Sequence, residues 1–254
     1  MTGTGWTGNL TPPFEPVPAT LPGPGILRQD WTSITFVHWA VDPELVAGLL
    51  PAGTRPDVLD GVTYVGLIPF HLRHGGLARG PGVPFIGDFA ETNVRLYSVD
   101  RQGRHGVVFR SLETARLLFA LGSRFFLGLP YMWARMRIRR DGDALEYTTR
   151  RRWPGPRGVG GTMRVTVGEP VAQLSPVEEF VTARFGLHTR RLGRTLWLPN
   201  HHTPWPLRRA TLEHLDDSLL AVAGLPGVAG RAPDSVLHSA GIRTTFGTPR
   251  LVRA

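Results

Sequence analysis

The chain has 254 residues, of which 41% are hydrophobic and 19% are charged. This composition supports a buried core and excludes a wholly disordered chain. The 29 basic residues are all arginine, against 20 acidic residues, and the sequence contains neither lysine nor cysteine. A side-chain Schiff base, a thiolate nucleophile, disulfides and cysteine-ligated metals are therefore excluded.

Targeting signals and a nucleic-acid signature are both missing from the sequence. No apolar run approaches the roughly 18 residues of a membrane-spanning helix, and no basic segment precedes an apolar core at the N-terminus. We therefore expect a cytoplasmic protein without a membrane partner. The net charge of +9 is spread along the chain. Because no helix-turn-helix, zinc finger or aromatic RNA-binding motif accompanies it, no specific nucleic-acid partner is predicted.

The densest basic stretch alternates with a period of two residues. Arg135, Arg137 and Arg139 share one face of a predicted strand, and Met136 and Ile138 share the other. A solvent-exposed sheet face accounts best for this pattern. A phosphate-binding ribbon and the anion-lined wall of a pocket are the alternatives.

The first part of the chain differs in composition from the rest. Six prolines among glycine and threonine in residues 1–25 predict a mobile tail, followed by a single domain over residues 26–254. From Ile34 onward, alternating apolar patterns and turn dipeptides predict strands and hairpins, with a loop over residues 74–84. The strands are expected within residues 34–39, 57–72, 93–112, 135–152, 187–198, 207–213 and 236–246.

Four helical segments separate these strands. They are expected over residues 43–50, over 113–126, from Pro176 after a Ser-Pro-Val-Glu capping box, and over 216–223. In the second segment, Leu117, Leu118, Leu121 and Phe125 recur at helical spacing as an apolar stripe. Few helices among many hairpins predict an α+β fold with a predominantly antiparallel sheet or barrel.

Histidine pairs and a glycine run give weak functional signals. His201 and His202 are adjacent, so in an extended segment their side chains point in opposite directions and one metal ion rarely binds both. The glycines of residues 158–161 follow no apolar strand and precede no lysine, unlike a phosphate-binding loop. We therefore predict neither a metal site nor a cofactor.

Polar residues alternate along an otherwise apolar predicted strand. Glu91, Asn93 and Arg95 share one face of it. One interpretation is a sheet face exposed to water. The other is a polar wall inside an apolar barrel, where burial would raise the pKa of Glu91 into the range useful for proton transfer.

Two further stretches combine aromatic residues with glycine or proline. After the second predicted helix, Gly-Leu-Pro leads directly into Tyr131, Met132 and Trp133, and one interpretation is that this turn places a phenol at the mouth of a pocket. Further on, two prolines hold Trp205 in an extended segment. An aromatic packing corner explains the first stretch equally well, and packing alone explains the second.

As a set, these stretches resemble the YqjF-like family of uncharacterised bacterial proteins. The resemblance covers about residues 31–245 and is carried by short segments in the family's order. They are ITFVHW (34–39), VDP (41–43), LP (50–51), DG (60–61), YVGLIPF (64–70), ETNVR (91–95), FRSL (109–112), GLPY (128–131) and HTPWPL (202–207).

That family is similar in fold to acetoacetate decarboxylase. The resemblance therefore implies a mostly β, cone-shaped barrel around a pocket, with a few flanking helices. In the decarboxylase a Gly-x-Pro-Lys-Lys stretch supplies two lysines, and Tyr131 and Met132 stand in their place here. Glu91 is the implied counterpart of a glutamate in the decarboxylase pocket. The resemblance thus implies a retained pocket that has lost its Schiff-base nucleophile.

Two functions follow as hypotheses. The first is an enzyme that acts on a small carbonyl or carboxylate compound by non-covalent acid/base chemistry, such as enolisation, dehydration or cyclisation. Glu91 would act as acid or base, Tyr131 would hydrogen-bond a developing oxyanion, and Arg95 or Arg110 would bind a carboxylate.

The second hypothesis is a non-catalytic protein that binds or senses a small molecule in the same pocket. For both hypotheses, Asn93, Met132, Trp133 and Trp205 complete the candidate set of ligand-binding residues. A small-molecule ligand is the expected partner, and the sequence does not decide whether the protein forms a homo-oligomer.

Overall fold

Five long strands form the centre of the sheet and take part in two closed rings. The computed structural model describes residue 16 and residues 20–80 and 87–253, so most of the predicted tail over residues 1–25 lies outside the described residues. The five central strands pair in the order β12–β1–β3–β4–β5. They are β1 (Leu27–Val41), β3 (Thr63–Leu77), β4 (Phe89–Asp100), β5 (His105–Thr114) and β12 (Ser235–Phe246).

Each of the two outer strands of this central set pairs with one further strand over part of its length and with another over a different part. β12 pairs with β11 through residues 237–239 and with β10 through residues 244–246. β5 runs parallel to β6 at residues 112–114 and parallel to β9 at Val107. The remaining strands are β2 (Thr54–Pro56), β6 (Tyr131–Asp141), β7 (Ala144–Trp153), β8 (Gly160–Pro170), β9 (Gly186–Arg191), β10 (Arg194–His202), β11 (Leu207–Asp217) and β13 (Arg250–Leu251).

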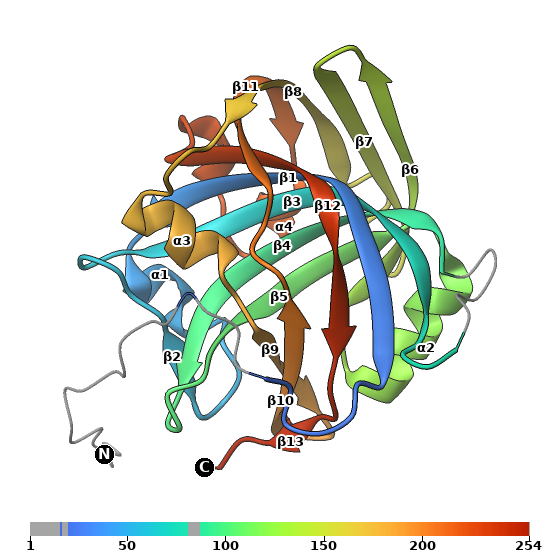
Figure 1. The fold of residues 1–254 in the computed structure, drawn as a ribbon, viewed down its shortest axis with the longest axis vertical. Helices are drawn as coiled ribbons and strands as arrows, with labels where there is room; N and C mark the ends of the chain where they lie inside the picture. Colours follow the sequence, from blue (N-terminus) through green and yellow to red (C-terminus); the bar gives the residue numbers. More distant parts are fainter. Residues whose placement is uncertain (1–15, 17–19, 81–86, 254) are drawn as a thin grey trace.

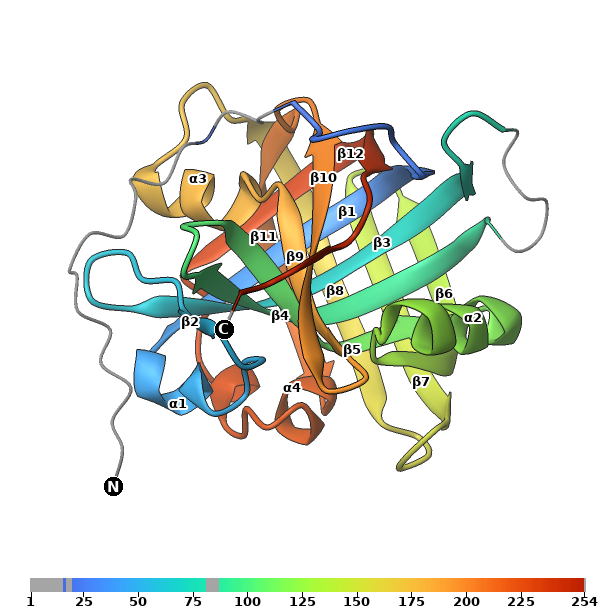
Figure 2. The ribbon, with the colours of Figure 1, turned by 90° about the horizontal axis from the view of Figure 1, so that it is seen from below.

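The sheet therefore encloses two lobes, as Figure 2 shows. One lobe is closed by β6, β7, β8 and β11, and the other by β9 and β10. Within the described residues, four short α-helices and one 3-10 turn accompany them: α1 (Pro43–Ala47), α2 (Leu117–Leu127), α3 (Pro176–Thr182), α4 (Leu219–Val222) and the turn at Val228–Gly230. The predicted class, α+β with a predominantly antiparallel sheet that curls into a barrel and a few helices, is confirmed.

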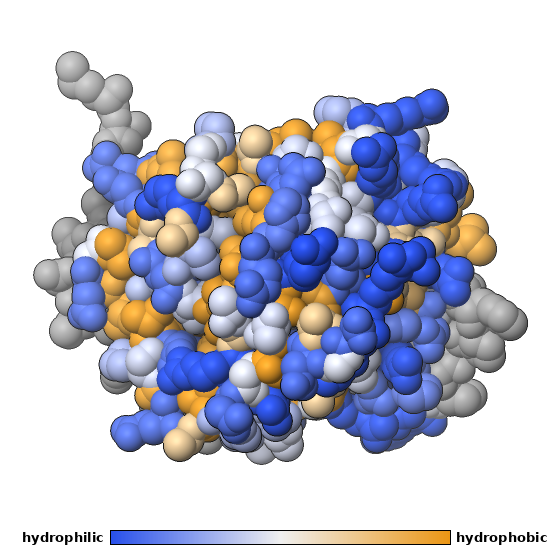
Figure 3. All heavy atoms as spheres, turned by 90° about the horizontal axis from the view of Figure 1, so that it is seen from above, coloured by the Kyte–Doolittle hydropathy of each residue, from blue (hydrophilic) through white to orange (hydrophobic). Residues whose placement is uncertain are grey.

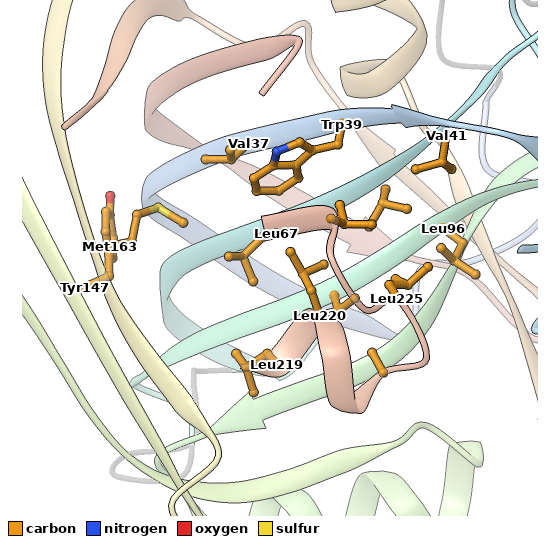
Figure 4. Close-up of a cluster of buried hydrophobic side chains, with 14 of the residues drawn as sticks. Val37, Trp39, Val41, Leu67, Leu96, Tyr147, Met163, Leu219, Leu220 and Leu225 are labelled. Carbon is orange, nitrogen blue, oxygen red and sulfur yellow. The ribbon is translucent and has the colours of Figure 1, made fainter. Parts of the chain in front are cut away.

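The first lobe is filled by side chains and carries the main core. Leu219 and Leu220 of α4 lie against Trp39 of β1 and Leu67 of β3, all of them buried (Figure 4). Burying a leucine side chain fully contributes about 1.5–3 kcal/mol. This lobe therefore stabilises the fold and leaves the second lobe available for a cavity.

The β6–β7 hairpin shows the predicted alternation. Arg135, Arg137 and Arg139 are exposed, while Met136 and Ile138 are partly buried. In Figure 3 the right-hand part of this face of the molecule, where the hairpin lies, is mostly hydrophilic. The interpretation as a solvent-exposed sheet face is thus correct, and the anion-lined pocket wall is wrong.

Several predicted boundaries are wrong, for identifiable physical reasons. The strand β5 continues through Glu113 because that carboxylate pairs with Arg151 of β7, so helix α2 begins only at Leu117. The strand β3 runs through the predicted loop to Leu77, and residues 81–86 lie outside the described part. Of the glycines in residues 158–161, for which we expect a flexible turn, Gly158 does lie in a turn, but Gly160 and Gly161 begin strand β8. Helices α1 and α4 are each shorter than predicted.

The apolar stripe of α2 is not buried as its spacing suggests. Leu118, Leu121 and Phe125 are 68%, 42% and 74% exposed, and only Ala120 of this helix is buried. In contrast, the predicted capping box of α3 is confirmed. Ser175 Oγ accepts a hydrogen bond from the Glu178 N–H, and the Glu178 carboxylate accepts one from the Ser175 N–H.

Candidate functional site

A cavity of about 460 Å³ occupies the second lobe. This volume lies within the range typical of small-molecule sites. Its walls come from the inner faces of β1, β3, β4, β5, β9 and β10, and α2 forms one side. Most of the lining is apolar, including Trp31, Ile34, Ile68, Phe70, Val107, Phe109, Phe119, Leu129, Leu187, Leu198, Trp205 and Phe246.

The polar wall of the cavity comes mainly from β4. Glu91, Asn93 and Arg95 line the cavity and are only 3%, 5% and 8% exposed. Val94 and Leu96, on the opposite face of the strand, pack into the core of the other lobe. Both faces of this strand are therefore buried, which excludes the water-exposed sheet face.

Glu91 and Tyr131 meet at one end of this polar wall. The Tyr131 hydroxyl donates a hydrogen bond of 3.0 Å to Oε2 of Glu91. Burial raises the pKa of Glu91 to about 8, and the hydrogen bond from Tyr131 partly opposes that increase. Burial and the neighbouring carboxyl group raise the pKa of Tyr131 well above its usual value. At neutral pH Glu91 therefore titrates close to the ambient pH, as a proton-transfer group requires.

The turn after α2 sets the position of Tyr131. Gly128 ends the helix in the left-handed region, with φ of +68°, where a side chain would collide with the carbonyl oxygen of Arg190. The Pro130 carbonyl then accepts a hydrogen bond of 3.2 Å from the Leu112 N–H, and β6 begins alongside β5. This places the Tyr131 ring against Phe119 of α2, edge to face at 5.1 Å.

Arg95 carries the positive charge of the wall formed by β4. Its Nε donates to the Tyr97 hydroxyl at 2.9 Å and its Nη2 donates to the Val181 carbonyl at 2.8 Å. Among the described residues, no carboxylate lies within 4.0 Å of its guanidinium nitrogens. A buried cation that has only neutral hydrogen-bond partners is costly. An anionic group of a ligand would offset that cost.

A second layer of residues holds Arg95 in place. The Tyr97 hydroxyl also donates to the Val181 carbonyl at 3.0 Å and lies 2.6 Å from Nε2 of His38. Burial, together with the charges of Arg95 and Arg184, holds the pKa of His38 well below its ordinary value. His38 is therefore neutral at pH 7, and the positive charge here belongs to the two arginines.

Further polar residues of the cavity were not selected from the sequence as ligand-binding residues: Gln29, Ser123, Thr182, Arg184, Asn200 and His202. Arg184 forms a buried ion pair with Asp57. The Oδ1 atoms of Asn93 and Asn200 are buried and have no hydrogen-bond partner among the described residues. These two amide oxygens are therefore available to accept hydrogen bonds from a ligand. Leu198, Asn200 and His202 are every second residue of β10, so they share one face of the strand. This spacing in the sequence could have identified them as one wall of the cavity.

The candidate residues from the sequence divide into two groups. Glu91, Asn93, Arg95, Tyr131 and Trp205 line the same cavity. Trp205 stacks on Trp31 with ring centroids 6.0 Å apart, and its indole N–H donates to the Thr182 carbonyl at 3.1 Å.

The other three candidates point elsewhere. The Arg110 guanidinium donates to the carbonyls of Ala223 and Leu49 in the first lobe, each at 3.2 Å. Met132 is on the other side of β6 and accepts a weak contact of 3.8 Å from Arg124. Trp133 contacts Arg152 on the outer surface, with Cζ of Arg152 4.9 Å from the ring centroid. These residues are not part of the cavity.

Two structural tests bear on other classes of site. Across the described ranges there is no group of three or more His, Cys, Asp or Glu residues that could hold a metal ion. Within the same ranges, no helix is both long enough and apolar enough to span a membrane.

Comparison with known sequences gives a consistent result. Residues 28–243 match the DUF2071 family, described as "Uncharacterized conserved protein (COG2071)". The chain is also 29% identical over 232 residues to the protein YqjF of Bacillus subtilis (strain 168). That alignment covers 91% of this chain and 94% of YqjF.

Comparison with solved structures confirms the fold. The acetoacetate decarboxylase of Legionella pneumophila matches with a TM-score of 0.62 and 16% identity, over 92% of this chain and 93% of that one. The enduracididine biosynthesis enzyme MppR, solved with pyruvate, matches with a TM-score of 0.61 and 16% identity, over 92% and 93% of the two chains. At this identity the comparison establishes the acetoacetate decarboxylase-like fold.

Proposed function

The chain belongs to the DUF2071 family and has the acetoacetate decarboxylase-like fold, and on that basis we propose that it is an enzyme for a small carboxylate that also carries a carbonyl group. The reaction is non-covalent proton transfer next to the carbonyl, as in enolisation, dehydration or cyclisation. The chain has no lysine, so a Schiff base on a side chain is excluded. The observation that carries the proposal is the buried Glu91–Tyr131 pair in a cavity that also contains Arg95.

The hydrogen bond between Tyr131 and Glu91 suggests how the proton moves. Ionised Glu91 accepts the hydrogen bond of Tyr131 and removes the proton on the carbon next to the substrate carbonyl. Once Glu91 is protonated, its neutral carboxyl group no longer requires the hydrogen bond that the Tyr131 hydroxyl donates. The Tyr131 hydroxyl then donates to the enolate oxygen, which stabilises the charge that develops there.

Arg95 would bind the substrate carboxylate through a charge-assisted hydrogen bond. Glu91 and Arg95 are four residues apart on an extended strand, so their Cα atoms are separated by about 13 Å. Asn93 lies between them on the same face, and the other walls of the cavity are mainly apolar. The proposed substrate therefore has its carbonyl and its carboxylate separated by an apolar chain. MppR was solved with pyruvate, in which the two groups are adjacent, and we expect a longer compound here.

Ligand binding tests the proposal first. We would measure thermal stabilisation by pyruvate, by levulinate and its longer ω-acetyl homologues, and by the matching methyl ketones that lack the carboxylate. The longer acids should stabilise the protein, by about 2.7 kcal/mol at a hundredfold excess over the Kd, and the ketones should stabilise it much less.

The two arginines provide a matched pair of variants. Arg95→Gln should weaken binding of the acids roughly tenfold or more while leaving binding of the ketones nearly unchanged. Arg110→Gln should change neither, because Arg110 faces the other lobe. Equal effects of the two substitutions, or no binding of any acid, would refute the proposed substrate class. Binding without exchange of the protons next to the carbonyl would favour a non-catalytic binding protein instead.

A further inference from the structure

The surface of α2 is apolar on the side that faces away from the barrel. Leu117, Leu121 and Phe125 are spaced by four residues and form one exposed ridge. Leu118 and Phe126, 68% and 65% exposed, form a second ridge with Gly122 between them. Monomeric proteins rarely expose apolar patches of this size without a partner.

A hollow lies beside the first ridge and adds to the same surface. It has a volume of about 570 Å³ and is lined by Leu117, Leu121, Trp133 and Trp153, with arginine side chains at its edge. Trp153 is 46% exposed. The protruding Phe125 and the hollow are thus about two helical turns apart on one face, so the surface carries both a projection and a recess that can receive an aromatic ring.

The area of this surface fits a protein–protein contact. The exposed parts of the α2 side chains, with Trp153 and Leu77, amount to an apolar area on the order of 800 Å². One partner of an interface of standard size contributes about the same area. No acidic residue lies within α2, so no carboxylate would have to be desolvated when this helix is covered.

We propose that two copies of this chain pair through α2, with the two helices antiparallel across a two-fold axis near Leu121. In this arrangement Phe125 of the partner subunit fills the hollow next to Leu117, and the reverse contact is identical, as an isologous interface requires. The absence of a side chain at Gly122 lets the two helices approach closely over the second ridge.

The arginines beside the hollow favour an aromatic occupant. Arg152 and Arg157 line the hollow together with Trp133 and Trp153. Guanidinium groups bind well over aromatic rings such as phenylalanine, so they suit the Phe125 ring of the partner subunit.

The pairing would also complete the cavity. Leu118 and Phe126 line the cavity although most of each side chain is exposed, so they lie at its rim. A second α2 packed on this rim would cover the side of the cavity next to Glu91 and Tyr131 and limit access of water. The proposed interface rests on α2 and the hollow beside it and does not depend on the chemistry proposed for Glu91.

The lack of native cysteine allows a direct cross-linking test in the full chain. Near the two-fold axis, residue 121 faces its own copy, within reach of a disulfide. Leu121→Cys should therefore form a disulfide-linked dimer under mild oxidation. Leu45→Cys, on α1 at the opposite side of the molecule (Figure 1), is similarly exposed, 48% against 42%. It should cross-link at least roughly tenfold more slowly.

Sedimentation velocity of the unmodified chain provides the second measurement. The wild type should sediment as a dimer, Phe125→Asp as a monomer and Leu45→Asp as a dimer. A monomeric wild type, or a dimer that Phe125→Asp leaves intact, would overturn the proposal. So would a monomer that binds vesicles of phosphatidylcholine and phosphatidylglycerol through Phe125, because the surface would then be a lipid contact.

Discussion

The hydroxyl of Tyr131 lies 3.0 Å from Oε2 of Glu91, inside a cavity where both side chains are almost fully buried. The two residues come from strands β4 and β6, forty positions apart in the sequence. Burial favours the neutral carboxyl group and the phenol supports the ionised one, which leaves the pKa of Glu91 at about 8. A carboxylate whose pKa is about 8 is a stronger base than an ordinary carboxylate, and the group still ionises near neutral pH.

The stability of the fold should depend on pH through Glu91. The pKa of this group is raised from 4.5 to about 8 on folding, so its contribution is most favourable below pH 4.5 and is lost as the pH rises toward 8. Between pH 5 and pH 8 the free energy of unfolding of the wild type should fall by about 3–4 kcal/mol relative to Glu91→Gln. Urea denaturation of both proteins across this range checks the prediction, and parallel curves would contradict it.

The pH dependence of catalysis should reveal which form of Glu91 is active. If ionised Glu91 is the base, kcat/KM should rise with pH and level off above a pKa of about 8. The measurement is the rate of exchange of the protons next to the carbonyl of a long ω-acetyl carboxylate. A rate that instead falls above pH 8 would assign Glu91 the role of a general acid and refute the proposed mechanism.

Tyr131→Phe should raise the pKa of Glu91 further. The hydrogen bond from Tyr131 lowers that pKa, so its removal leaves burial unopposed. NMR titration of the side-chain carboxyl carbon of isotopically labelled Glu91 measures the change directly. Tyr147→Phe is the control, because its hydroxyl bonds to Thr35 in the other lobe, and it should leave the titration of Glu91 unchanged. A downward change in the pKa of Glu91 in Tyr131→Phe would contradict the account.

Glu113 should matter for stability and not for the cavity. Its carboxylate pairs with the buried Arg151 at 2.6 Å. Glu113→Gln leaves that guanidinium without a counter-ion, and should lower the free energy of unfolding by about 3–5 kcal/mol. Glu146→Gln removes the partner of Arg164, which is 53% exposed, and should cost less than about 1 kcal/mol. Similar losses in the two variants, measured by denaturant unfolding, would show that the Glu113–Arg151 pair is not buried as described.

The sequence was sufficient to place the polar residues of β4 on one face, but not to decide whether that face meets water or lines a cavity. Period-two alternation within one strand placed Glu91, Asn93 and Arg95 on one face, and the same regularity places Met132 away from Tyr131 on β6. A strict use of that regularity would have removed Met132 from the candidates. Trp133 is two residues after Tyr131, so strict alternation would place both side chains on the same face. Trp133 however precedes a register shift in the pairing of β6 with β7, and its side chain lies on the outer surface.

Other features depend on long-range pairing that local patterns do not contain. Arg110 is the residue of β5 that the register with β4 skips, between Phe109 and Ser111, and this irregularity changes the face on which its side chain lies. Arg184 is placed in the cavity by its ion pair with Asp57, 127 residues away. The stripe on α2 has the spacing of a buried helix, but spacing alone does not say whether its own chain or a second copy covers it.

The central claim is that Glu91 transfers a proton in this cavity, and hydrogen–deuterium exchange tests it most directly. A long ω-acetyl carboxylate is incubated in D₂O with wild type, Glu91→Gln or the surface control Glu146→Gln, and loss of the proton signals next to the carbonyl is followed by NMR. Wild type and Glu146→Gln should exchange these protons at the same rate. Glu91→Gln should bind the compound within about tenfold of the wild-type affinity and show no exchange above background. Exchange by Glu91→Gln at the wild-type rate would contradict the account.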